Sequence, residues 1–295
     1  MKKKIFGILV SIALMATMLS FLAACGEKTA PDDVNVSEKQ QETANSQATQ
    51  SNVASATIEE TVMWDNNDIK ITALSLSSDQ NYHILNLRIE NKTGKDLHVL
   101  ASRTAVNTFV VEPIMGVNVP ANSTEDGELK FYRDDVPAGV IADIETRFSY
   151  SSSDYSVNTK TERVKLKSSA ADSYDYSYDE SGTVLHDADG IKIICKGFND
   201  AGNPIVYLSS TGELSEGCCV EVAEIFVNGS KTYSDYCEWV FTNTRNIAEL
   251  ELSDEDLDGN KLGKIENLKV SFKINKEHMA DTSPVRTEPV EIPVK

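Results

Sequence analysis

The strongest constraint on the fold of this sequence is that its second half repeats a pattern of residues found in the first. Asp65-x-x-x-Ile69-Lys70-Ile71 returns 122 residues later as Asp187-x-x-x-Ile191-Lys192-Ile193. Further matches keep the same order: Thr93-Gly94 with Thr211-Gly212, Val99 with Val220, Val106-Asn107 with Val227-Asn228, Leu129-x-Phe131 with Leu250-x-Leu252, Ile144-Glu145 with Ile265-Glu266, and Thr161-Glu162-x-Val164-x-Leu166 with Thr287-Glu288-x-Val290-x-Ile292. Matches that stay in order over so long a stretch predict two copies of one domain.

Apolar residues in each copy mostly alternate with polar ones, which is typical of half-buried strands. Leu85, Leu87 and Ile89 share one face of such a strand, and Val270, Phe272 and Ile274 share another. Only a second sheet can cover these apolar faces, so we expect an all-β fold with two tandem antiparallel immunoglobulin-like β-sandwich domains. A small barrel is the alternative. Short helical turns are expected within residues 134–144 and 253–265.

The first 25 residues form a secretory leader rather than part of the fold. Three lysines at positions 2–4 precede an apolar run over residues 5–21, and Leu22-Ala23-Ala24-Cys25 follows. The run is near the lower length limit for a transmembrane helix, about 17 residues, so an uncleaved span is the competing interpretation. Small residues before a cysteine resemble the lipobox of bacterial lipoproteins. This resemblance implies cleavage before Cys25, diacylglycerol on its sulfur, and an anchor of more than one acyl chain.

Composition then divides the chain into a signal peptide (1–24), a lipidated cysteine with a flexible tether (25–58), a first sandwich (59–168), a linker (169–182) and a second sandwich (183–295). The tether is rich in polar residues and nearly free of large apolar ones, so we expect it to be disordered. The linker carries Tyr174, Tyr176 and Tyr178. We interpret it as a solvated connection, with an adhesive strip of tyrosines or a strand lining the domain junction as the alternatives.

The chain is strongly acidic, with 28 basic and 46 acidic residues and a net charge of -18. Such a surface repels the phosphates of nucleic acid, so we expect no nucleic-acid partner. The apolar fraction of 40% is ordinary for globular domains.

Four cysteines remain after lipidation, all of them in the second copy: Cys195, Cys218, Cys219 and Cys237. Export permits disulfides. Adjacent residues of a strand face opposite sides, so Cys218 and Cys219 do not pair with each other. Cys195 and Cys219 are the candidate disulfide, and buried free thiols are the alternative. The spacing of these cysteines does not support a zinc site.

An acidic stretch resembles the opening of a calcium-binding loop. Asp254, Asp256 and Asp258 alternate with other residues before Gly259, which offers carboxylate oxygens on a sharply turned backbone. The twelfth position of the loop is Ile265, where a bidentate glutamate is expected, and Glu266 comes one residue late. We therefore interpret the stretch as an acidic connecting turn. Asp254, Asp256 and Asp258 are the ligands if calcium binds, and we expect no other cofactor.

No motif of a hydrolase, metalloprotease, nucleotide-binding or dinucleotide-binding enzyme occurs in the sequence. The histidines are scattered, and Trp64 and Trp239 are typical of core or sheet-edge packing. We therefore expect a protein that is not an enzyme.

The lipobox, the polar tether and the elements Asn91-Lys92-Thr93-Gly94-Lys95-Asp96-Leu97, Val106-Asn107 and Val227-Asn228 resemble uncharacterised Gram-positive cell-surface lipoproteins with tandem immunoglobulin-like repeats. That resemblance implies a lipoprotein on the extracytoplasmic face of the cell membrane. We expect a non-enzymatic binding or display module of the cell envelope whose partner is an envelope protein or polysaccharide. A structural accessory subunit of a membrane complex and an envelope enzyme are the alternatives.

Overall fold

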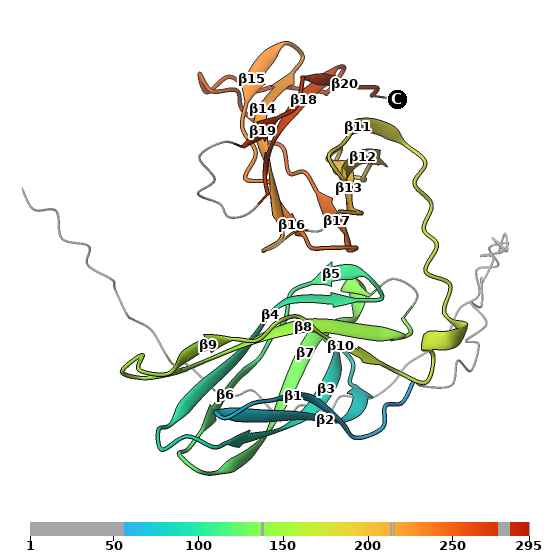
Figure 1. The fold of residues 1–295 in the computed structure, drawn as a ribbon. Helices are drawn as coiled ribbons and strands as arrows, with labels where there is room; N and C mark the ends of the chain where they lie inside the picture. The colour runs from blue at the N-terminus through green and yellow to red at the C-terminus, as the bar shows by residue number, and fades with distance from the viewer. Residues whose placement is uncertain (1–55, 137–138, 213, 215, 277–283, 295) are drawn as a thin grey trace, which may run out of the picture. The chain divides into compact units, whose positions relative to one another are not determined.

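A computed structural model describes residues 56–136, 139–212, 214, 216–276 and 284–294 (Figure 1). Its elements are twenty strands and two short 3-10 turns, η1 (Arg133–Asp135) and η2 (Ala171–Ser173). The all-β prediction is confirmed. Residues 253–265 form bends, one hydrogen-bonded turn at residues 257–258 and an isolated bridge between Glu255 and Lys261, so no helix forms where a helical turn was expected. The residues expected to form the leader and most of the tether, Cys25 included, lie outside the described residues. Within them, no helix has the length and apolar character needed to span a membrane.

The first copy places two antiparallel sheets face to face. One sheet has the order β1 (Thr61–Asp65), β2 (Ile69–Ser78), β3 (Tyr82–Asn91), β7 (Thr124–Tyr132). The other has the order β10 (Val164–Lys167), β8 (Asp143–Ser152), β4 (Leu97–Val106), β5 (Phe109–Val111), with β6 (Gly116–Val119) also paired to β4 and β9 (Asn158–Lys160) to β8. Leu85, Leu87 and Ile89 of β3 are fully buried against Phe148 and Tyr150 of β8 in one apolar core. The alternation seen in the sequence is therefore the burial pattern of this sandwich.

The second copy repeats this order strand for strand. Its first sheet runs β11 (Thr183–Ala188), β12 (Ile191–Phe198), β13 (Pro204–Ser210), β17 (Arg245–Glu249). Its second runs β20 (Val290–Ile292), β18 (Leu268–Asn275), β14 (Cys218–Val227), β15 (Ser230–Thr232), with β16 (Cys237–Val240) on β14 and β19 (Val285–Arg286) on β18. A separate cluster of buried side chains, including Ile193, Leu208 and Phe272, forms its core. A single parallel pair, Arg245 with Phe109, joins β17 to β5 and makes one continuous ten-stranded sheet.

One asparagine closes the same corner in both copies. Asn107 and Asn228 both adopt positive φ angles, 51° and 52°, at the turns after β4 and β14. The side-chain oxygen of Asn107 accepts hydrogen bonds from the backbone N–H groups of Ala142 and Asp143. That of Asn228 accepts them from Glu266 and Asn267. Asparagine tolerates the left-handed conformation and can bond to nearby backbone, which explains why this residue recurs here.

These bonds fix which residues of the two copies are equivalent. Ala142 corresponds to Glu266, so Ile144 corresponds to Leu268 rather than to Ile265, and the sequence match at that point is wrong by three residues. The match at the chain's end is right. Thr161 exchanges two hydrogen bonds with the backbone of Phe148, and Thr287 does the same with Phe272.

Tyrosines of the linker are packed rather than solvated. Tyr176 donates a hydrogen bond of 2.5 Å to Asp143, whose side chain is buried. The ring of Tyr178 stacks on Tyr207 of β13 with the centroids 5.1 Å apart. No strand forms between residues 174 and 182, so neither interpretation of this segment fully holds.

Candidate functional site

A cavity of about 1140 Å³ opens at one end of the second sandwich. It lies where β12 and β14 end and where the connection from β17 to β18 crosses between the sheets. Its walls combine apolar side chains with polar loop residues. The apolar members are Phe198, Val227, Leu252, Leu262, Ile265, Ile292 and Val294. A concave site with an apolar floor and a polar rim is the usual setting for ligand binding.

The corresponding end of the first sandwich is filled by its own side chains. Ile141 occupies the position equivalent to Ile265, since each immediately precedes a residue bonded to the corner asparagine. Ile141 is 5% exposed and belongs to the core, together with Val136 and Phe131. Ile265 and Leu252, the counterpart of Phe131, are only partly buried and line the cavity. Among the described residues, Ile265 thus lines a cavity whereas its equivalent Ile141 is packed into the core.

The connection that borders the cavity is longer in the second copy. Leu250 lies 121 residues after Leu129, whereas Leu268 lies 124 residues after Ile144, which adds three residues between them. The added length forms the acidic turn. Leu257 on this turn is 59% exposed, whereas Val136 on the first copy's connection is 4% exposed and packs into the core. The longer connection thus turns outward and leaves the end of the sandwich open.

The acidic turn is held by its own hydrogen bonds. The Asp256 carboxylate accepts bonds from the backbone N–H groups of Asp258 and Asn260 and from the Asn260 side chain. These bonds, chiefly the one from the Asn260 backbone, lower the pKa of Asp256. Asp254, Asp256 and Asp258 do not bring their carboxylate oxygens together as a set of ligands among the described residues. The stretch connects β17 to β18 through a turn that the Asp256 hydrogen bonds close.

Charges around the cavity are balanced. Lys196, Lys261 and Lys264 lie among its lining residues, as do the acidic residues Asp200, Asp254 and Glu255. Lys196 is already engaged, because its Nζ donates hydrogen bonds of 2.6 Å to the backbone oxygens of Asp179 and Ser181. No strong field of one sign therefore selects an ion at this site.

Cys195 is the one thiol among the residues that line the cavity. Burial raises the pKa of the Cys195 thiol, and its sulfur lies 3.5 Å from the backbone oxygen of Gly197. A buried, protonated thiol is a poor nucleophile. Among the residues that line the cavity, the Cys195 thiol is therefore not activated for attack.

The cysteines are not arranged as the sequence suggested. Cys195 and Cys218 lie in the core of the second sandwich. Cys219 faces the other side of β14, as expected from its position next to Cys218, and its sulfur lies 2.7 Å from that of Cys237. The candidate pair of Cys195 and Cys219 is therefore corrected, because Cys195 belongs to the opposite sheet and points into the core.

The turn signal in the sequence was not enough to identify Cys237 as the neighbour of Cys219. Asn228-Gly229 is a typical hairpin turn, and it reverses the chain between β14 and β15. Counting outward from that turn places Tyr236 opposite Glu221, but the register shifts by one residue between β15 and β16, so Cys237 lies there instead, diagonal to Cys219 on the same face. Cys219, Glu221 and Cys237 form the one group of three metal-ligating side chains found among the described residues.

Two further candidates, Trp64 and His83, pack within the first sandwich. Trp64 packs against the core of the first sandwich. His83 is buried beside Phe131 and forms a hydrogen bond of 2.7 Å with Ser78, and burial lowers the pKa of its ring.

No protein-family model and no curated protein matches this sequence. Among solved structures, a conserved domain protein from Bacillus anthracis is similar with 11% identity and a TM-score of 0.27, over 81% of this chain and 92% of that one. A Salmonella enterica SafA pilin in complex with the SafB chaperone matches with 9% identity and a TM-score of 0.24, over 78% and 98%. The YadV chaperone matches with 13% identity and a TM-score of 0.23, over 71% and 92%. TM-scores this low carry no argument about function.

Proposed function

We propose that this chain is a lipoprotein of the extracytoplasmic membrane face that binds an envelope protein through the cavity of its second sandwich. Diacylglycerol on Cys25 is the proposed anchor, and the polar residues up to 58 are the proposed tether. The protein acts by binding rather than by catalysis.

The observation that carries this proposal is the difference between the two copies. The same end of the same fold is closed by Ile141 and Val136 in one copy and open around Ile265 in the other. A closed end is the better solution for stability, since buried apolar side chains favour folding. An end that is open at Ile265, where the equivalent described residue of the first copy is buried, therefore supports a role for the exposed surface.

The lining favours a protein partner over a polysaccharide. Leu252, Leu262, Ile265 and Val294 offer aliphatic surface suited to apolar side chains, and Phe198 is the one aromatic ring among the lining residues. Sugar rings usually need several aromatic faces and many polar groups for recognition. An exposed peptide segment with apolar side chains fits the observed lining better.

Binding at the cavity can be tested by filling it. In the full chain, Ile265→Trp should place a larger side chain in the cavity and reduce recovery of a cross-linked envelope protein at least tenfold. Leu257→Trp is the matched control, because Leu257 lies on the same connection but does not line the cavity. Equal recovery with both variants would contradict the proposal, and so would capture of a polysaccharide in place of a protein.

The anchor is tested separately. Cys25→Ala should abolish incorporation of a labelled fatty acid and release the protein from membranes, because position 25 then has no thiol to receive the lipid. Labelling that persists in this variant would refute the assignment of Cys25.

A further inference from the structure

Two cysteine side chains meet on the outer face of the second sandwich. Cys219 lies on β14 and Cys237 on the neighbouring strand β16, where Cys237 is directly opposite Glu221. The two cysteines are thus diagonal neighbours on one face, and their sulfur atoms lie 2.7 Å apart. The buried core on the other face of β14 contains Cys218 and Val220 instead.

The first sandwich shows that the fold itself brings these two positions together. Strand pairing makes His98 the equivalent of Cys219 and Gly116 the equivalent of Cys237. A β-carbon placed on Gly116 would lie 3.5 Å from Cε1 of His98. The same diagonal contact therefore exists in both copies, and only the second copy has a thiol at each end of it.

The surroundings of the pair argue against a metal site. Glu221 is the third ligating side chain of the group, but its carboxylate is already paired with Lys273, at 3.1 Å, and with the Asn275 side chain, at 3.2 Å. A lysine ammonium beside the ligand group opposes a bound cation. Burial also raises the pKa of the Cys219 thiol, which disfavours the thiolate that a metal requires.

We propose that Cys219 and Cys237 form a disulfide in the exported protein, while Cys195 and Cys218 remain thiols. In this step both S–H bonds break and the Sγ–Sγ bond forms. The two electrons and two protons pass to a disulfide-bonded oxidant, whose own bond breaks to give a dithiol. The bond depends on the export proposed above, because disulfides persist in oxidising compartments.

The cross-link would hold the short strand β16 on β14. Its two cysteines are 18 positions apart, and the segment that it closes includes the hairpin turn and β15. A cross-link of this kind restricts the unfolded chain and favours the folded one. Cys237 is partly exposed whereas Cys219 is buried, so a reductant reaches the bond from the Cys237 side.

Peptide mapping of the full-length protein tests the bond. The protein is isolated from membranes, its thiols are blocked with N-ethylmaleimide at lysis, and it is cleaved with trypsin without reduction. Cleavage after Lys196, Lys231 and Arg245 places Cys219 in peptide 197–231 and Cys237 in peptide 232–245. We expect these two peptides to be joined, with a mass two hydrogens below their sum, and to separate on reduction.

Single variants assign the sulfur atoms. Cys219→Ser and Cys237→Ser should each abolish the joined peptide. Cys218→Ala is the matched control, because Cys218 lies on the same tryptic peptide but faces the core, and the joined peptide should persist. Cys195 is on the separate peptide 193–196, so its participation would be detected directly.

Three outcomes would overturn the proposal: N-ethylmaleimide on both Cys219 and Cys237, a cross-link that contains peptide 193–196, or one zinc ion bound per chain with both thiols free. Lipid on Cys25 is read in the same sample. Lipidated protein without the cross-link refutes the disulfide alone, and cross-linked protein without lipid refutes the anchor alone.

Discussion

Individual side chains account for the recurring turns of this fold. The corner asparagines show this most directly, because one residue supplies both a left-handed backbone and an acceptor for two N–H groups. The repeated Val-Asn pair was visible in the sequence. Its bonding partners were not visible, because the connection that leads to them is three residues longer in the second copy. The equivalent positions therefore lie three residues away from where the sequence match placed them. The repeated pair was therefore recognised from side-chain identity, whereas the corner and its bonding partners were not.

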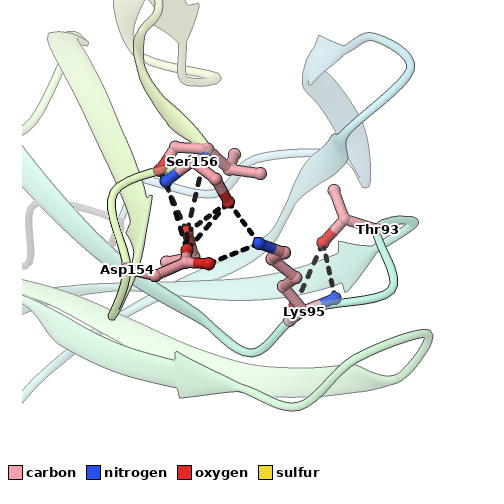
Figure 2. A network of polar contacts seen from close by, with 6 residues as sticks. Thr93, Lys95, Asp154 and Ser156 are labelled. Atoms are coloured by element: carbon pink, nitrogen blue, oxygen red, sulfur yellow. Dashed lines mark hydrogen bonds and ion pairs between the residues drawn. The ribbon is translucent and has the colours of Figure 1, made fainter.

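A second side-chain network joins two turns at the other end of the first sandwich. Figure 2 shows Lys95 reaching the carboxylate of Asp154 and the hydroxyl of Ser156, while Thr93 braces the turn that carries Lys95. Asp154 also accepts hydrogen bonds from Ser152 and Ser156. The hydrogen bond from Lys95 is the largest of the causes that lower the pKa of Asp154.

We predict that Lys95→Met raises the pKa of Asp154 toward the ordinary value of about 4. Because the folded-state pKa is lowered, the contribution of Asp154 to stability is complete above about pH 4 and is lost only as pH falls toward the folded-state value. Carbon-13 NMR titration of the carboxyl group measures this directly. Lys92→Met is the control, since Lys92 lies on the same turn but pairs with Asp65. An unchanged Asp154 titration in the Lys95 variant would contradict the network.

At the scale of elements, the connection from β7 to β8 packs differently from its equivalent, the connection from β17 to β18. The first copy's connection turns inward and contributes Val136 and Ile141 to the core. The second copy's connection turns outward around the Asp256 hydrogen bonds. The same end of the sandwich can therefore be packed or open, depending on a few residues in the connection between equivalent strands.

We predict that Ile141→Ala and Ile265→Ala differ in their effect on stability although the positions are equivalent. Ile141 is buried, so its truncation should lower the free energy of unfolding by about 2–5 kcal/mol. Ile265 already contacts the open cavity, so its truncation should cost about 1 kcal/mol or less. Urea denaturation of the two variants gives both values. Equal losses would mean that the second end is as closed as the first.

Alternating apolar residues predicted the long strands well. β3 and β18 have the burial pattern that their sequences indicated. The short strands β5, β6, β9 and β19 have at most four residues each, too few for alternation to be recognised. The cavity was not predicted either. The apolar residues around Ile265, like those at the first copy's end, are of the kind that fills a core, so the sequence does not distinguish an open end from a packed one.

At the scale of the whole molecule, the described residues contain two apolar cores with the same strand order. The repeat predicted this, because each copy has enough alternating segments to cover both faces of its own core. The sequence could not predict that β5 and β17 would pair and make one sheet continuous, since a single parallel pair leaves no pattern in the residues.

We predict that the two cores respond separately to matched truncations. Phe148 and Phe272 are equivalent and fully buried, and replacing either with alanine should cost about 3–5 kcal/mol. Trp64 reports on the first sandwich and Trp239 on the second. In variants that retain one tryptophan, Phe148→Ala should shift the unfolding midpoint reported by Trp64, and Phe272→Ala that reported by Trp239. A shift of both reporters with either variant would indicate one cooperative unit.

The unfilled end of the second sandwich also affects how this chain can diverge. Substitutions around Ile265 and Leu262 sacrifice little burial, because water already reaches those side chains. Substitutions at Ile141 disrupt a sealed interior. Substitutions should therefore accumulate around the cavity of the second sandwich, while the equivalent positions of the first sandwich stay nearly invariant. New ligand preferences can then arise without loss of the fold.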